Sequence, residues 1–131
     1  KGDRSTASYL QTCIAEAYRR RIFSMLGQAR KSGRITAGTS LVEGELRRGA
    51  AGTWLGLLAE DASLNISGRI ERVMKAASLP YRIFSSREEL GDAVGKSPRS
   101  VVLIKDAAMA EIIRVSLDHY RRVLSNGGLN Q

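Results

Sequence analysis

One short segment of the chain has the composition of an anion-binding site: Gly38, Thr39, Ser40 and Leu41. Gly38 has no Cβ, so a ligand can approach its backbone closely. The amides that follow it would begin a helix, where free N–H groups and the helix dipole favour negative charge. Lys31 and Arg34 come just before the segment. The pattern predicts a phosphate-binding site.

A second basic segment, residues 95–100, could reach the same edge of the fold. It contains Lys96, Ser97 and Arg99 between two predicted elements. Two cationic loops beside a row of free amides would suit phosphate oxygens, and the planar guanidinium of arginine suits them best. The alternative is that Gly38 serves only a tight turn and Ser40 only caps a helix.

The residues that usually carry catalysis are too few or too scattered to form a site. Glu60 and Asp61 are adjacent, so their side chains point to opposite sides of an extended chain, and we expect Asp61 to order a loop or cap a helix. Cys13 and His119 are the single cysteine and histidine, which excludes an ordinary zinc site. No Walker or dinucleotide fingerprint is present. We expect neither enzymatic activity nor a cofactor nor a metal.

The net charge indicates the class of partner. The 131 residues carry 21 lysines and arginines against 13 aspartates and glutamates, a net charge of +8. Residues 1–50 hold ten basic and four acidic side chains. This excess favours a polyanion. Arg47 and Arg48 are predicted to lie in the last turn of a helix. There they would either compensate the helix dipole or bind the anionic partner, and both roles remain open.

Two further features of the sequence indicate the cellular compartment. No run approaches the roughly 18 apolar residues of a membrane helix. One cysteine allows no internal disulfide. We expect a cytoplasmic monomer without a membrane partner.

Helices and strands are predicted to alternate along the chain. Residues 1–8 and 125–131 are polar and are expected to be flexible, leaving one domain over residues 9–124. Continuous apolar runs indicate strands buried on both faces, so the alternation favours a three-layer αβα sandwich. Helices are predicted over residues 9–31, 40–49, 63–79, 86–94 and 106–124, and strands over 34–36, 53–59, 81–84 and 100–104. Ser40 with Glu43 and Ser86 with Glu89 form capping-box patterns, and Leu41, Val42 and Leu46 are predicted to be buried.

Three segments in register resemble the ribosomal protein superfamily that includes L7Ae and L30e. They are RKSGRITAGTSLVEGELRRG at 30–49, LLAEDAS at 57–63 and LGDAVGKSPRSVVLI at 90–104. The resemblance covers about residues 20–115 and is closest to bacterial ribosomal-protein-like members. It implies a mixed four-stranded sheet between helices, and binding of structured RNA of the kink-turn or ribosomal type. The contacts would come from residues 34–44 and from the loop at residues 95–100.

The chain departs from the classical family pattern at three positions. Ser40, Leu41 and Gly44 stand where the family usually carries asparagine, glutamate and lysine. The second loop carries Lys96 and Arg99 where classical members are apolar, a composition suited to phosphates. These departures leave a second hypothesis open, a protein-interaction scaffold that keeps the fold without affinity for RNA.

Overall fold

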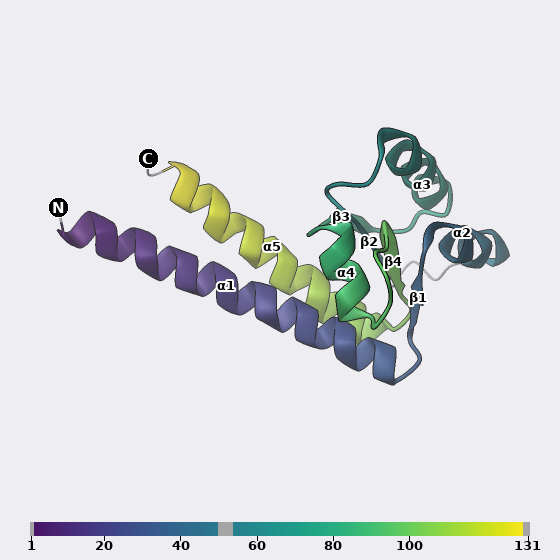
Figure 1. Cartoon of the computed structure of the whole chain (residues 1–131), viewed down its shortest axis with the longest axis horizontal. Helices are drawn as coiled ribbons and strands as arrows, with labels where there is room; N and C mark the ends of the chain where they lie inside the picture. Colours follow the sequence, from purple (N-terminus) through teal and green to yellow (C-terminus); the bar gives the residue numbers. More distant parts are fainter. Residues whose placement is uncertain (1, 50–53, 130–131) are drawn as a thin grey trace.

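The computed structural model describes residues 2–49 and 54–129. In this part of the chain, helices and strands alternate from end to end (Figure 1). The helices are α1 (Gly2–Lys31), α2 (Thr39–Arg48), α3 (Leu64–Ala76), α4 (Arg87–Ala93) and α5 (Ala107–Leu129). The strands are β1 (Ile35–Ala37), β2 (Leu55–Leu58), β3 (Tyr81–Ile83) and β4 (Val101–Ile104). The strand predicted to begin at Thr53 starts outside the described residues.

The four strands form one mixed sheet in the order β1-β4-β2-β3. β4 pairs antiparallel with both β1 and β2, while β2 and β3 are parallel. Both central strands, β2 and β4, are buried along their whole length. The mixed four-stranded sheet is therefore confirmed.

Helices cover both faces of this sheet, which confirms the three-layer αβα sandwich. Side chains alternate along β4, so Val102 and Ile104 face one core and Val101 and Leu103 face the other. The first core lies under α1, α4 and α5, and the second lies under α2 and α3. Figure 1 shows α1 and α5 side by side, with α2 and α3 grouped away from them.

Local hydrogen bonds fix the start of three helices. Ser63 Oγ accepts from the amide of Ile66, and Ser86 Oγ accepts from the amide of Glu89. A carboxylate oxygen of Asp106 accepts from the amide of Met109 at 2.9 Å. These caps satisfy N–H groups that have no partner inside the helix; the cap at Ser86 is as predicted, and Ser63 and Asp106 stand at the predicted starts of their helices.

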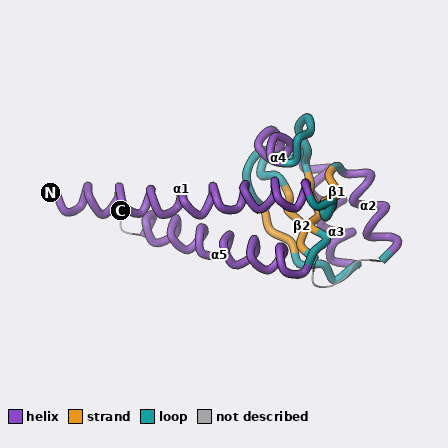
Figure 2. Tube along the Cα trace, turned by 90° about the horizontal axis from the view of Figure 1, so that it is seen from below, coloured by secondary structure: helices purple, strands orange, loops and turns teal. Residues whose placement is uncertain are grey.

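The outer helices are longer than the sequence predicts. α1 begins at Gly2 and not near Tyr9, and α5 continues to Leu129 and not to about Leu124. Once a helix is nucleated, each further residue adds one hydrogen bond, so polar residues can extend it without a buried face. Together the two helices project from the sheet as an arm that carries both termini (Figure 2). Among the described residues, none of the helices combines the length and the hydropathy of a membrane-spanning segment.

Candidate nucleic-acid interface

The antiparallel pairing of β1 with β4 brings the two predicted segments to one edge of the sheet. Ala37 lies opposite Val102, so the end of β1 is next to the start of β4. The amide of Gly38 extends this ladder by donating to the carbonyl of Val101 at 3.0 Å. Residues 38–41 and 96–99 therefore flank the same edge. We call these two segments the rim.

Gly38 and Arg99 are in direct proximity within the rim. The φ angle of Gly38 is 107°, a region that other residues rarely adopt. A Cβ at this position would lie 3.7 Å from Cδ and Nε of Arg99. Arg99 therefore lies against the backbone where α2 begins, and it is the positive φ of residue 38 that requires glycine there.

The start of α2 differs from the predicted capping box. Gly38 is the N-cap, no side chain caps the helix, and its first turn holds no acidic residue. Glu43 cannot reach back to Ser40 because its carboxylate accepts two hydrogen bonds, each 2.6 Å long, from Arg69 of α3. The prediction of the Ser40–Glu43 box is wrong, and the amides that begin α2 remain uncapped by side chains.

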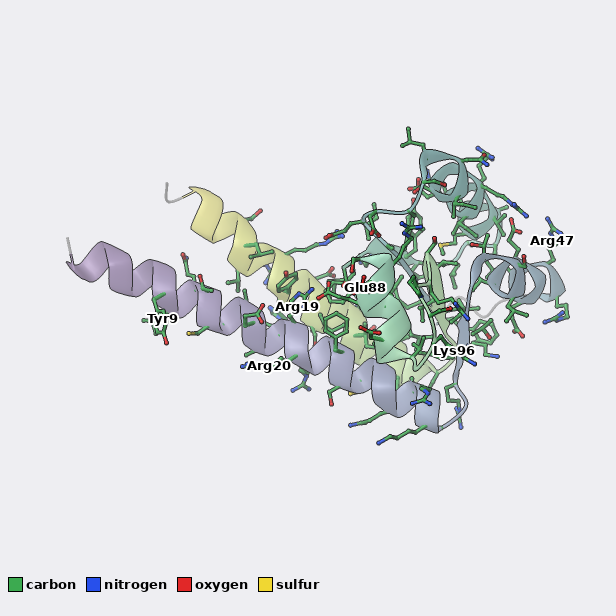
Figure 3. All side chains as sticks on the ribbon, viewed as in Figure 1. Tyr9, Arg19, Arg20, Arg47, Glu88 and Lys96 are labelled. Atoms are coloured by element: carbon green, nitrogen blue, oxygen red, sulfur yellow. The ribbon has the colours of Figure 1, made fainter. Side chains whose placement is uncertain are left out.

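A hollow of about 400 Å³ adjoins the rim. It is lined by Arg30, Ile35, Thr36, Ala37, Leu41, Glu45, Arg48, Val94 and Lys96. Leu41 is 65% exposed here, so its predicted burial is wrong, whereas Val42 and Leu46 are buried as predicted. The single carboxylate of the hollow, on Glu45, is balanced by Arg48 at 3.1 Å and Lys105 at 3.7 Å. Figure 3 shows Lys96 near β1.

Not every predicted site residue joins this hollow. Lys31 ends α1, at the far end of β1 from Gly38, and Arg34 forms an ion pair with Asp106 at 3.0 Å. Neither lines the hollow, although both are exposed. Arg99 donates to the hydroxyl of Ser97 at 2.7 Å and to two carbonyls of its own loop, so it also holds that loop in shape.

Two arginines of the hollow were not among the predicted site residues. Arg30 extends from α1 toward Gly95, where a Cβ would lie 2.7 Å from its Nε. Arg48 follows Leu41 by seven residues on α2. The available signal was helical periodicity, because residues 41, 45 and 48 share one face of a helix.

Helix α4 holds the second loop of the rim in place. The amide of Lys96 donates to the carbonyl of Gly91 at 2.8 Å, and the amide of Arg99 donates to the carbonyl of Arg87 at 3.0 Å. The amide of Arg87 in turn donates to a carboxylate oxygen of Asp61 at 2.8 Å. Asp61 therefore orders the start of α4, as predicted.

An ion pair fastens α4 to α1. Arg19 donates to the carboxylate of Glu89 at 2.6 Å, and Ser85 donates to the same oxygen at 2.7 Å. These two hydrogen bonds lower the pKa of Glu89 to about 2, although partial burial opposes them. The rim therefore rests on a short helix that is held by charge as well as by the core.

Nothing in the described ranges groups three histidine, cysteine, aspartate or glutamate side chains as a metal ion would require. The arrangement of backbone amides, guanidinium and ammonium groups suits the binding of anionic oxygens.

Comparisons with known proteins agree with this fold. A profile of the ribosomal protein L7Ae/L30e/S12e/Gadd45 family matches residues 20–114. The RNA-binding protein YlxQ of Bacillus subtilis is 34% identical over 96 residues, which cover 73% of this chain and 94% of that protein.

Solved structures show the same architecture. A Bacillus halodurans protein of unknown function superposes with a TM-score of 0.68 at 25% identity, covering 74% of this chain and 96% of its own. A Giardia lamblia 15.5 kDa RNA-binding protein gives a TM-score of 0.64 at 19% identity, and the match covers 82% of this chain and 90% of that protein. The family assignment supports a binding module and not an enzyme. The chain belongs to the ribosomal protein L7Ae/L30e/S12e/Gadd45 family.

Proposed function

We propose that the chain binds structured RNA through the rim. The observation that carries the proposal is the proximity of Gly38 and Arg99, because it joins uncapped amides and a cationic loop at one edge. The name of its Bacillus subtilis relative, an RNA-binding protein, supports the same class of ligand.

The groups of the rim suit recognition of backbone and shape. Amides at the start of α2 favour a phosphate, and Lys96 and Arg99 add charge beside it. The neighbouring hollow offers the exposed Leu41 to an unstacked base, with Arg30 and Arg48 around it. A sharply bent internal loop presents phosphates and an unstacked base together, so we propose a kink-turn or a similar loop of ribosomal RNA as the ligand.

Titration against two RNAs tests this function. One RNA contains a kink-turn, and the other is a straight duplex of matched length and composition. We expect tighter binding to the kink-turn and, for about five phosphate contacts, a log–log salt slope of about 3–5 in magnitude. Equal, weak binding to both RNAs would exclude the kink-turn, and a flat salt response would exclude the phosphate contacts.

We place this function in the cytoplasm, where the exposed thiol of Cys13 would stay reduced. A monomer is sufficient, because all the groups of the rim come from one chain. Sedimentation of the free protein and of its RNA complex measures the oligomeric state directly, and a second protein copy in the complex would contradict the monomer.

A protein partner is the second candidate function, favoured by apolar side chains on the arm. Tyr9, Leu10 and Ile14 of α1 are 68%, 53% and 47% exposed, and all three precede the segment that matches the family. Pull-down with and without ribonuclease separates the two functions. Partners that survive digestion would support the scaffold, and partners lost on digestion would support RNA.

A further inference from the structure

Helices α2 and α3 expose charge of one sign. Every exposed charged residue of these two helices is basic: Arg47, Arg48, Arg69, Arg72 and Lys75. We call these five side chains the helical face. By contrast, α4 exposes Glu88 and Asp92 beside Arg87, and α1 exposes Glu16 among its arginines.

The three carboxylates of α2 and α3 are buried or partly buried, and each accepts a hydrogen bond or joins an ion pair within the fold. The side chain of Glu43 is 5% exposed and is held by Arg69. Glu45 is paired with Arg48 and with Lys105. Glu71 accepts a hydrogen bond of 2.7 Å from the hydroxyl of Tyr81. No exposed anion therefore offsets the positive potential of these helices.

Three cations of the helical face are free to bind a ligand. Arg47, Arg72 and Lys75 form no ion pair with any residue that the structure describes. Arg72 folds over Gly68, where a Cβ would lie 3.5 Å from its Nη1. Exposed cations without an ion-pair partner favour phosphate oxygens, which can replace water as their hydrogen-bond acceptors.

The helical face continues from the rim. α2 starts at Gly38 in the rim and runs ten residues, about 15 Å, to Arg48, which also lines the hollow. α3 lies against α2 and is joined to it by the Arg69–Glu43 pair. Figure 3 shows Arg47 at the end of the molecule opposite the termini. A rigid ligand that leaves the rim along α2 would therefore pass over these cations.

We infer that a double-helical stem of the bound RNA lies over the helical face, with its phosphates against Arg47, Arg72 and Lys75. The inference rests on the proposed function, because the rim fixes where the stem begins. A protein partner fits this face less well, since the centre of protein interfaces is poor in charge. The large exposed apolar residues of these helices, Leu41 and Leu64, lie in their first turns, away from Arg47, Arg72 and Lys75 in sequence.

The test compares three RNAs that share one bent internal loop. In the first, both stems stop next to the loop; in the second and the third, one stem or the other is extended by about one helical turn. The helical-face variant carries Arg47→Gln, Arg72→Gln and Lys75→Gln.

A charge-matched control removes three exposed cations elsewhere in the fold. It carries Arg20→Gln and Arg21→Gln on α1 and Arg122→Gln on α5, which likewise form no ion pair within the described residues. Both triple variants lose the same net charge. Any difference in RNA binding between the two variants therefore reflects the position of the lost charges and not the total charge.

Wild type and control should bind one extended RNA more tightly than the short RNA, and the helical-face variant should not. Three lost contacts lower the magnitude of the salt slope by about 2–3. Between about 50 and 200 mM salt, wild type should lose about 30-fold more affinity for the extended RNA than the variant loses.

Three outcomes would overturn the inference. The first is an equal salt slope for wild type and the helical-face variant on both extended RNAs. The second is an equal loss of affinity in the variant and the control. The third is a variant with normal RNA binding that instead loses a ribonuclease-resistant protein partner. If wild type binds the short RNA normally, the rim proposal stands even then. If wild type binds none of the RNAs, the rim proposal and the inference about the helical face both fail.

Discussion

Substitution of Gly91 by alanine should displace one loop of the rim, and so weaken RNA binding, while the rest of the fold stays intact. Gly91 is a buried residue of α4. A Cβ there would lie 2.7 Å from the carbonyl carbon of Ser97 and 2.9 Å from Cα of Pro98, and closer still to the carbonyl oxygen of Ser97. These are backbone atoms, so no side-chain rotation can relieve the contact. The loop that carries Lys96 and Arg99 must move.

The magnitude follows from two opposed effects. Ordinary contacts lie at 3.4–4 Å, so the loop must recede by about 1 Å. Overpacking of this kind costs about 1–3 kcal/mol, while alanine gains up to about 1 kcal/mol over glycine inside a helix. We expect a net loss of about 0–3 kcal/mol in the free energy of unfolding. RNA affinity should fall by at least about tenfold, because Lys96 and Arg99 leave their positions.

Gly68→Ala on α3 is the matched control. The nearest atom to a Cβ there is Nη1 of Arg72, 3.5 Å away at the end of a flexible side chain. The same substitution should therefore stabilise the protein by up to about 1 kcal/mol and leave binding to a short-stem RNA unchanged. Urea unfolding followed by circular dichroism and titration with that RNA measure both quantities. If Gly91→Ala matches Gly68→Ala in stability and wild type in affinity, α4 does not position the loop as described.

Three further predictions concern charge. Replacing Lys96 and Arg99 together by alanine should lower the salt slope of RNA binding by about 1.5 and change the unfolding free energy by less than about 1 kcal/mol; an unchanged slope would contradict the site. Glu89 has a pKa of about 2, below its ordinary value of 4.5, so its stabilisation is complete above about pH 4.5 and is lost as the pH falls toward 2. Allowing for a carboxylate that is 44% exposed, wild type should lose about 1–2 kcal/mol more over this range than Glu89→Gln loses, as unfolding at several pH values would show. Arg69→Met should cost about 1–3 kcal/mol because it leaves the carboxylate of Glu43 buried without its partner, and adding Glu43→Gln should recover part of that loss; a further loss in the double variant would contradict the pairing.

Local patterns in the sequence were sufficient for the elements and for most helix starts. Ser63, Ser86 and Asp106 act within three residues of their own position, so their sequence neighbours reveal them. Buried runs such as 101–104 identify central strands because both faces must be apolar. The αβα arrangement follows from the alternation of these elements.

Contacts between distant segments were not accessible in the same way. Ser40 and Glu43 have the spacing of a capping box, but Arg69, 26 residues further along the chain, holds Glu43 instead. Periodicity placed Leu41 on the buried side of α2, yet it lies one position beyond the packed face and is exposed. Arg30 enters the site only through its contact with Gly95, which no spacing in the sequence predicts. The composition of the two loops indicated a phosphate site, whereas the pairing of β1 with β4 determines that they meet.

The departure at Gly44 has a different meaning in three dimensions than along the sequence. A Cβ at residue 44 would lie 3.7 Å from Nη1 of Arg48, so the guanidinium folds back over the glycine. A larger residue at position 44 would compete with the arginine for that space. A guanidinium therefore lies above residue 44 although the residue itself has no charge, and Arg48, which also pairs with Glu45, lines the hollow that contains Leu41 and Lys96. The absence of the family's usual lysine at position 44 therefore does not by itself argue against RNA binding, because Arg48 places a cation above the same position.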